Sequence, residues 1–240
     1  MRLNIAHPCE TPRPSGLPLN AQFAVDVPDR YRRVPVRYAA VESSLLMQHP
    51  SVGPLLTESA QRAKVLEGML RAVAEKGFAA ATVADAVRLA RVSRGTFYAL
   101  FDSKEACLAS AYRLGCEVLE ARISAAVREA ADWREELRLG LRAYLHTLEE
   151  DPLFARVYLL ESTAVEAERQ ATLTRFLARY RTTFARSGRP VPPDDALFVL
   201  AVGIHELACT RVRAGERVTD LEDILVGCAV RLAAEEEPWT

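Results

Sequence analysis

The stretch from Thr82 to Lys104 constrains the fold of this chain more than any other part of the sequence. Its first half has apolar residues at helical spacing, and Thr82 followed by Asp85 three residues later is typical of a capped helix start. Ser93 is a second good N-cap, and the helical pattern after it continues to about Phe101. The sequence therefore predicts two short helices joined by a tight turn, with the start of a third helix behind them.

The second short helix has two faces of different character. Phe97 and Phe101 are four residues apart and should both point inward. The other side, which solvent would meet, carries Arg94, Gly95, Thr96, Tyr98 and Ala99. A short helix that presents an arginine, a threonine and a tyrosine, braced by a helix of small residues, suits the floor of a DNA major groove.

From about Glu58 to Leu119 the chain resembles the TetR family of bacterial one-component transcriptional regulators, which carry a helix-turn-helix of the TetR/AcrR type. The resemblance is carried by the Gly77-Phe78 end of an amphipathic first helix, Thr82-Val83, the run from Val92 to Tyr98, Phe101, and Ser103-Lys104-Glu105. It implies an all-α protein in which a three-helix DNA-binding head is joined to a helical bundle for ligand binding and dimerisation. About nine helices are expected, and the lack of strand-like alternation agrees with that class.

The resemblance also implies which residues contact DNA. Arg94 is expected to contact a base edge, since arginine binds guanine bidentately, and Thr96 and Tyr98 match family positions that bond phosphates or bases. Thr82 and Lys104 lie at predicted helix N-termini, where backbone N–H groups favour a phosphate. The full expected set is Thr82, Ser93, Arg94, Gly95, Thr96, Tyr98 and Lys104.

Two positions depart from the family pattern. Leu100 stands where the family usually has a histidine that contacts phosphate. Arg91 stands where a turn glycine is common, and a left-handed arginine there would cost about 1 kcal/mol. The same arginine could instead place a cation near the phosphates.

Charge, cysteines and hydropathy narrow the possibilities for the chain as a whole. Its 240 residues carry a net charge of −1, but residues 58–113 hold nine Lys or Arg against six acids, which suits a DNA-binding end. The five cysteines include no C-x-x-C pair, which favours reduced, mostly buried thiols over structural zinc or disulfides. Without a signal peptide or an apolar run near the roughly 18 residues of a membrane span, we expect a cytoplasmic protein with no membrane partner.

Sequence motifs of catalysis, metal binding and cofactor binding are missing. The chain has no glycine-rich nucleotide loop, no H-E-x-x-H and no G-x-S-x-G, and its four histidines are far apart. We therefore expect no enzyme activity, no metal and no cofactor.

The chain divides into three predicted parts. Residues 1–56 hold eight of the thirteen prolines and are expected to be largely irregular or disordered. Met47 within them could be the true start. An arginine-rich segment there is either a flexible basic arm on DNA or a solvated tail (Arg30, Arg32, Arg33 and Arg37). Residues 57–119 form the DNA-binding head, and residues 120–240 form the ligand-binding and dimerisation domain.

Periodicity and capping residues predict the other helices. They cover residues 58–76, from 102 or 103 to about 131, 132–150, from 152 onward, 167–187, from 194 or 195 to 214, and from 219 onward. The expected N-caps in the body are Asp132, Asp194 or Asp195, and Thr219. The last two helices, about 194–214 and 219–235, carry more apolar residues than one bundle needs, and the resemblance implies that they pair with their copies in a homodimer.

Candidate ligand-binding residues lie in the body. Aromatic and polar side chains could wall an apolar pocket for a small-molecule effector: Tyr112, Cys116, Tyr144, Tyr158, Glu161, Tyr180 and His205, with Phe154 and Phe176 as further walls. Ordinary core packing is the alternative for the aromatic residues. His205 could equally be a satisfied core residue or lie in a dimer seam, and Glu161 could be on the surface.

Together these features predict a ligand-responsive, DNA-binding transcriptional regulator, most simply a repressor, that binds a palindromic DNA operator as a homodimer. A small apolar effector would release it by favouring a spacing of the two heads that no longer fits the operator. The alternatives are a helical small-molecule sensor or interaction bundle that does not act on DNA, and a small enzyme.

Overall fold

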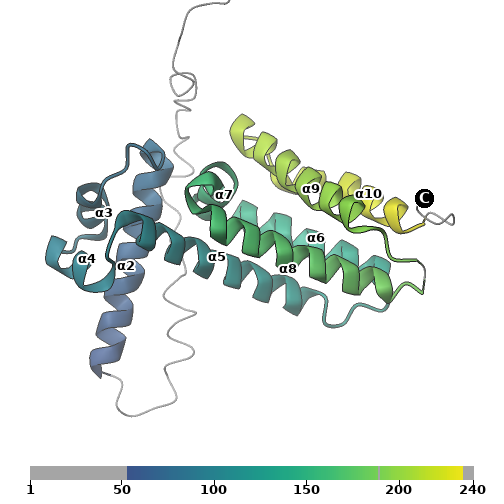
Figure 1. The fold of residues 1–240 in the computed structure, drawn as a ribbon, viewed down its shortest axis with the longest axis horizontal. Coiled ribbons are helices and arrows are strands. Elements are labelled where there is room, and N and C mark those ends of the chain that lie inside the picture. The colour runs from purple at the N-terminus through teal and green to yellow at the C-terminus, as the bar shows by residue number, and fades with distance from the viewer. Residues whose placement is uncertain (1–52, 189, 235–240) are drawn as a thin grey trace, which may run out of the picture.

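Helices make up the architecture of the computed structural model, which describes residues 53–188 and 190–234 (Figure 1). Its α-helices are α2 (Gly53–Lys76), α3 (Val83–Ala90), α4 (Arg94–Leu100), α5 (Lys104–Ala126), α6 (Trp133–Glu150), α7 (Pro152–Leu160), α8 (Glu166–Ala185), α9 (Asp194–Ala214) and α10 (Glu222–Ala234). Two short 3₁₀ helices are η2 (Ser162–Val165) and η3 (Val218–Leu221). Nine α-helices and no strand among the described residues confirm the predicted all-α class with about nine helices.

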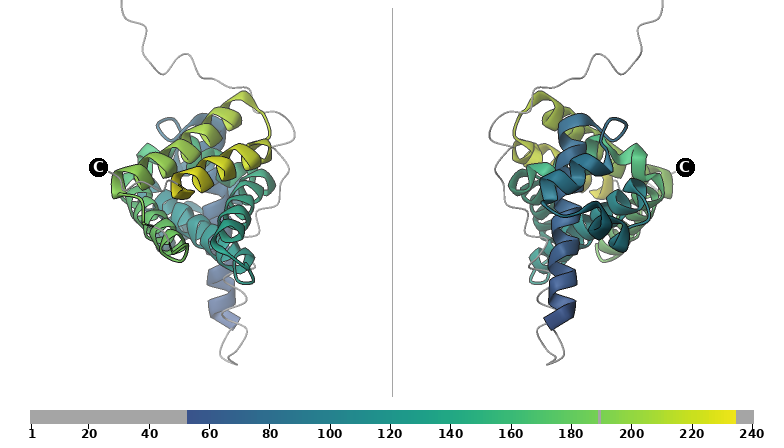
Figure 2. Two further views of the ribbon diagram at one scale, coloured as in Figure 1. Left: turned by 90° about the vertical axis from the view of Figure 1, so that its right-hand side faces the viewer. Right: turned by 90° about the vertical axis from the view of Figure 1, so that its left-hand side faces the viewer.

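Helices α2, α3 and α4 form a head around one core (Figure 1). The predicted apolar stripe of α2 faces inward, so that Leu66 and Met69 are at most 1 % exposed. Phe97 enters the same core from α4 and is fully buried. Gly68 lets α2 and α3 approach closely, because a Cβ added there would stand 2.4 Å from the Ala86 carbonyl oxygen. The N-terminal end of α2 extends beyond the head (Figures 1 and 2).

Helix α5 leaves the head and runs into a bundle with the remaining helices (Figure 1). Helices α6 and α8 lie beside α5, and α9 and α10 pack across the other side of the bundle (Figure 2). Leu119, Leu145 and Phe184 come from three different helices and are fully buried in its core. Head and body share one continuous hydrophobic cluster, with contacts from α2 to both α5 and α7.

Two helix boundaries in the first half differ from the predicted ones. Helix α2 begins at Gly53 rather than at residue 58, so its first turn lies inside the predicted irregular extension. Helix α5 ends at Ala126 rather than near residue 131. The chain leaves the helix there because Asp132 caps α6 as predicted and the Glu135 carboxylate accepts the Ala131 N–H at 2.7 Å.

The starts of α9 and α10 also differ from the predictions. Pro193, rather than an aspartate, is the N-cap of α9, and Asp194 is already helical. Thr219 lies within η3, where its N–H and its hydroxyl both donate to the Glu149 carboxylate. Helix α10 therefore begins at Glu222, and the prediction of Thr219 as its cap was wrong.

Residues 1–52 and 235–240 lie outside the described residues. The predictions of a disordered extension, an arginine-rich arm and a start at Met47 concern that part of the chain. The domain boundary near residue 120 stays a prediction, and α5 passes through it without a break. None of the described helices is long and apolar enough to cross a membrane.

Candidate DNA-binding surface and ligand cavity

Local hydrogen bonds set the geometry of the turn between α3 and α4. Thr82 Oγ1 accepts the Asp85 N–H at 3.1 Å and the Asp85 carboxylate accepts the Thr82 N–H at 3.2 Å, which is the predicted capping box. The hydrogen bond from Lys76, together with those from Thr82, lowers the pKa of Asp85 to about 2. Arg91 adopts the left-handed conformation with φ of 57°, and its N–H bonds back to the end of α3.

Helix α4 presents a polar face to solvent and is anchored on its other face. Ser93 caps the helix by accepting the Thr96 N–H at 2.9 Å. Phe97 is fully buried, and its ring contacts those of Tyr98 and Phe101. The exposed residues are Arg94, Gly95, Tyr98 and Ala99, and Thr96 is half-buried. The inward and outward faces predicted for this helix are therefore confirmed.

Three exposed arginines follow one another at intervals of three residues across this turn: Arg88 on α3, Arg91 in the turn and Arg94 on α4. Within the described residues, the side chains of Arg91 and Arg94 make no ion pair, and Arg88 lies 3.7 Å from the Asp85 carboxylate. Arg88 was not among the predicted DNA contacts, although its position three residues before Arg91 in the sequence could have indicated it. Arginines without a carboxylate partner beside an exposed helix favour a polyanion.

Two predicted phosphate-contacting side chains have partners inside the head. Lys104 Nζ donates to the carbonyl oxygens of Phe78 and Ala81, each at 3.0 Å, and lies 4.4 Å from the centre of the Phe78 ring. The Thr82 hydroxyl donates to the Asp85 carboxylate at 2.7 Å. At these two helix starts, the backbone N–H groups of the first turn are therefore better placed for a phosphate than the side chains.

A cavity of about 110 Å³ lies in the body between α5, α6, α7, α8 and α9. Five of the seven predicted pocket residues line it, namely Tyr112, Tyr144, Tyr158, Tyr180 and His205. Its lining is otherwise mostly apolar, with Glu136, Arg169 and Arg179 as the charged members. Aromatic walls with a few polar groups between helices are typical of sites for small organic molecules.

Cys116 is not part of this lining. It is fully buried, and it accepts a weak hydrogen bond from the Thr172 hydroxyl at 3.5 Å. Burial raises the pKa of its thiol to about 12, and burial likewise raises the pKa of Cys107 to about 12. These cysteines are therefore protonated core residues, as predicted for most of the thiols, whereas Cys228 is exposed.

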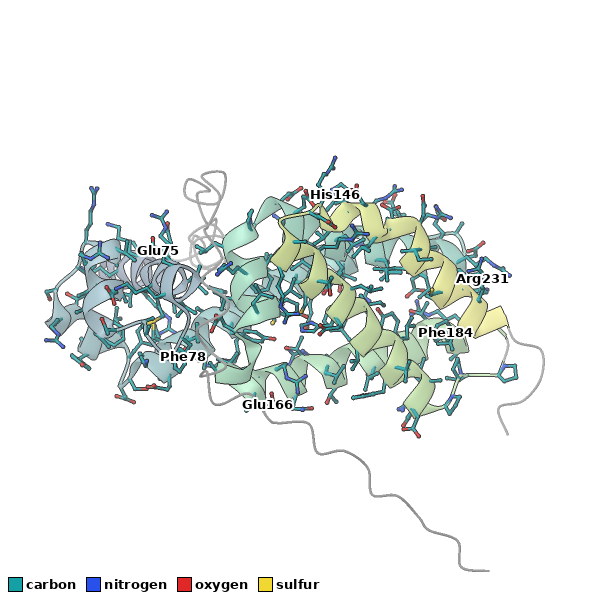
Figure 3. All side chains as sticks on the ribbon, turned by 90° about the horizontal axis from the view of Figure 1, so that it is seen from above. Glu75, Phe78, His146, Glu166, Phe184 and Arg231 are labelled. Atoms are coloured by element: carbon teal, nitrogen blue, oxygen red, sulfur yellow. The ribbon has the colours of Figure 1, made fainter. Side chains whose placement is uncertain are left out.

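Glu161 lies away from the cavity, where the body meets the head. Its carboxylate accepts the Phe78 N–H at 3.0 Å, and Phe78 is on the side of the head that faces the body (Figure 3). Arg156 donates from Nε to the Ala74 carbonyl oxygen at 2.7 Å. Both residues belong to α7 or directly follow it, and Tyr158 of the same helix lines the cavity. Helix α7 therefore touches both the cavity and the end of α2.

Helix α8 supplies seven of the lining residues, more than any other helix, and five of them were not predicted. Its lining residues recur at helical spacing: Arg169, Thr172, Leu173, Phe176, Arg179, Tyr180 and Thr183. Of these, only Phe176 and Tyr180 were predicted. Arg169 binds Glu166 through two hydrogen bonds of 2.7 Å, and Arg179 donates to Ser124 Oγ at 3.2 Å. The periodicity was present in the sequence, but polar residues within the stripe concealed it.

His205 enters the cavity from α9. Its ring meets that of Tyr158 edge-on, with 5.8 Å between ring centres, and it makes no hydrogen bond within the described residues. Burial lowers the pKa of His205, Glu206 opposes this shift, and Arg169 and Arg213 add to it. The imidazole is therefore neutral at pH 7.

We expect the chain to lose stability relative to a His205→Gln variant when the pH falls from 7.5 to 5.5. The folded pKa of His205 lies below its ordinary value of 6.5, so the unfolded chain takes up the proton first and unfolding is favoured below about that pH. Urea unfolding midpoints of both proteins at the two pH values measure the difference. Parallel pH dependence of the two proteins would contradict the buried, neutral histidine.

Exposed apolar side chains gather on α9 and α10. Their exposed fractions lie between 39 and 70 %, and they are Phe198, Val199, Val202, Leu207 and Ile224. Leu225 and Val226 of α10 are instead buried within the chain. Patches of this kind usually mark interaction surfaces. Elsewhere in the described part of the chain, no group of three His, Cys, Asp or Glu residues could hold a metal ion.

Residues 65–111, which cover most of the head and the start of α5, match the family model of bacterial regulatory proteins of the tetR family. Among curated protein sequences none matches the chain significantly. The chain is similar to the solved structure of the fatty acid degradation regulator FadR from Bacillus halodurans, with a TM-score of 0.66 at 19 % identity over 74 % of this chain and 97 % of that one.

Two further solved structures share this arrangement. The transcriptional regulator FadR from Bacillus subtilis, in complex with stearoyl-CoA, has a TM-score of 0.64 at 20 % identity over 70 % of this chain and 97 % of that one. A TetR-like transcriptional regulator from Rhodococcus sp. RHA1 has a TM-score of 0.60 at 18 % identity over 73 % and 97 %. These likenesses show the fold, a helix-turn-helix head on a helical body, and within that head residues 65–111 match the tetR family model.

Proposed function

We propose that the chain is a ligand-responsive repressor that binds a palindromic operator as a homodimer. The observation that carries this proposal is α4, a short helix that is anchored by the buried Phe97 and presents Arg94 and Tyr98 to solvent. A helix of this kind enters a DNA major groove and brings its arginine within reach of base edges. Arg88 and Arg91 would add phosphate contacts beside it.

A homodimer supplies the second head that recognition of a palindrome needs, because one head covers only a few base pairs. The exposed apolar residues of α9 and α10 support a two-fold interface along these helices. The predicted segments, about 194–214 and 219–235, contain this surface. Burial of such a patch against a second copy removes apolar area from water.

An effector in the cavity would act on the head through α7. Tyr158 lines the cavity, whereas Arg156 binds Ala74 near the end of α2 and Glu161 binds Phe78, two residues beyond that end. A shift of α7 would therefore move the head relative to the body and change the spacing of two heads in a dimer. The effector acts only if it binds the two states with different affinity. The stearoyl-CoA complex of FadR from Bacillus subtilis supports an effector with an apolar part.

An Arg94→Ala variant is expected to lose about 1–3 kcal/mol of operator binding and to relax preference at one base position, since a bidentate arginine–guanine contact is lost. Binding of purified wild-type and variant protein to a selected operator and its single-base variants measures both effects. Arg138→Ala, an exposed arginine on α6 in the body, is the matched control and should bind as the wild type does. Equal weakening on all DNA sequences would show that Arg94 is only a phosphate contact.

The alternative is a helical sensor or interaction bundle that does not act on DNA. The specific observation behind it is Leu100, which replaces a phosphate-contacting histidine and packs half-buried against the head core. Leu100 thus removes one DNA contact while it supports the fold of the head. Specific DNA binding falls steeply as salt rises, and absence of any such binding would favour the alternative.

A further inference from the structure

Three tyrosines of the cavity wall have no hydrogen-bond partner for their hydroxyl within the described residues. They are Tyr144 on α6, Tyr158 on α7 and Tyr180 on α8. Tyr144 and Tyr158 are only 6 % and 5 % exposed, so bulk water reaches little of either side chain. A buried hydroxyl without a partner is unfavourable, and nearly all such groups in proteins are hydrogen-bonded. The partner of the buried Tyr144 and Tyr158 hydroxyls would therefore come from what occupies the cavity, and the half-buried Tyr180 is a third donor in the same wall.

The charged groups of the wall do not supply that partner. Glu136 is the acidic residue of the lining, and its carboxylate already accepts from the Thr183 hydroxyl at 2.8 Å and from Arg186 at 3.0 Å. Arg169 and Arg179 can only donate. The cavity wall is thus richer in donors than in uncommitted acceptors, which include one ring nitrogen of the neutral His205 and the hydroxyl oxygens themselves.

These phenols are protonated at pH 7, and burial favours that state further. Burial raises the pKa of Tyr144 and of Tyr158 well above the ordinary value, and burial also raises the pKa of Tyr180. His205, which meets Tyr158 edge-on, is neutral because burial lowers its pKa. Uncharged O–H donors match an oxygen acceptor on a ligand and offer nothing to balance an ammonium group.

We propose that the cavity holds its effector through a carbonyl or carboxylate oxygen that accepts hydrogen bonds from the hydroxyls of Tyr144, Tyr158 and Tyr180. The assignment rests on the ligand-responsive function proposed above and names the chemical class of its effector. The aromatic walls hold the apolar remainder of the molecule.

The size of the cavity sets the size of suitable probes. Its volume is about 110 Å³. An engineered protein cavity of about 150 Å³ binds benzene, so this cavity is close to the size needed for one aromatic ring. The lining of α8 extends from Arg169 to Thr183, which is about 20 Å of helix, so a short chain fits as well as a ring. Acetophenone with ethylbenzene, and 2-octanone with octane, are pairs that differ mainly by one carbonyl oxygen.

Each pair is titrated against the full chain, and the affinity ratio of ketone to hydrocarbon is compared between the wild type and the variants Tyr144→Phe and Tyr158→Phe. We expect each variant to lower this ratio by about two- to tenfold, the worth of one hydrogen bond. The hydrocarbons should bind the variants at least as well as the wild type. An unchanged ratio in both variants overturns the proposal, and so does failure of both ketones to bind at millimolar concentration.

Thermal unfolding of the same variants without any probe separates this role from a structural one. Removal of an unpaired hydroxyl should leave the midpoint unchanged or raise it, whereas removal of a hydroxyl bonded within the protein would lower it. A lowered midpoint in both variants therefore contradicts the proposal.

Operator release by the same probes distinguishes failure of this proposal from failure of the proposed function. Octanoate is added as a third chain-shaped probe, so that carboxylate and ketone acceptors are compared directly. If the affinity ratio of ketone to hydrocarbon falls in the variants as expected, the acceptor site is supported. If the same probes leave the operator complex intact, the ligand-responsive function fails while the acceptor site stands. Unchanged ratios together with intact operator binding overturn the acceptor site and leave DNA binding standing.

Discussion

A Gly68→Ala variant is expected to destabilise the head by roughly 3 kcal/mol, the upper end of what an extra methyl group costs in a well-packed core. The added Cβ would stand 2.4 Å from the Ala86 carbonyl oxygen and 2.9 Å from the Ala90 amide nitrogen. Both are backbone atoms of α3, so α3 itself must move away from α2 and carry α4 with it. Urea unfolding followed by circular dichroism measures the loss, and operator binding should fall with it.

Gly95→Ala is the matched control for this effect. Gly95 is also in a helix of the head, but its added Cβ would meet nothing closer than Ser93 Oγ at 3.5 Å, which is ordinary contact. Alanine is the better helix former by about 1 kcal/mol, so the unfolding midpoint should stay or rise. Equal stability of Gly68→Ala and Gly95→Ala would contradict the close approach of α2 and α3.

A Phe97→Ala variant is expected to lose about 3–5 kcal/mol of stability, as large-to-small changes of buried phenylalanine do. Phe97 is fully buried and contacts the rings of Tyr98 and Phe101, so its loss leaves a cavity under α4. The measurement is the free energy of unfolding from urea titration. A change below about 1 kcal/mol would mean that α4 is not anchored through this side chain.

The neighbouring Tyr98→Ala variant, in contrast, should lose little stability and should lose DNA binding instead. Tyr98 is 52 % exposed, so its loss costs little beyond its edge contact with Phe97, about 0.5–1.5 kcal/mol. If α4 lies in a DNA groove, Tyr98→Ala weakens operator binding while the protein stays folded. A variant with unchanged DNA affinity would remove Tyr98 from the proposed contact surface.

The head could be predicted closely because its signals are local in sequence. The Thr82–Asp85 capping box, the Ser93 cap and the inward Phe97 each depend on residues three or four positions apart, and all three are present in the structure. Arg91 was expected to be left-handed if it took the place of a turn glycine, and its φ is 57°. Lys104 was less predictable, because its partners Phe78 and Ala81 are more than twenty residues away.

The body was harder to predict because its contacts join distant segments. The cavity takes residues from five helices, and only the aromatic ones stood out in the sequence. Glu161 was expected at the cavity, but it bonds to Phe78, 83 residues earlier, which no periodicity reveals. Thr219 had the residue pattern of a cap, yet Glu149 from α6 holds its N–H and hydroxyl and displaces the helix start.

Binding of the purified full chain to DNA fragments from its own upstream region tests the central claim most directly. The measurement is made at two salt concentrations with unrelated DNA as competitor. A specific regulator binds one fragment tightly despite the competitor, and its affinity falls steeply as salt rises because phosphate contacts release counterions. Binding no better than to the competitor, followed by failure to enrich any sequence from random DNA, would contradict a DNA-reading α4 and leave the chain as a helical sensor.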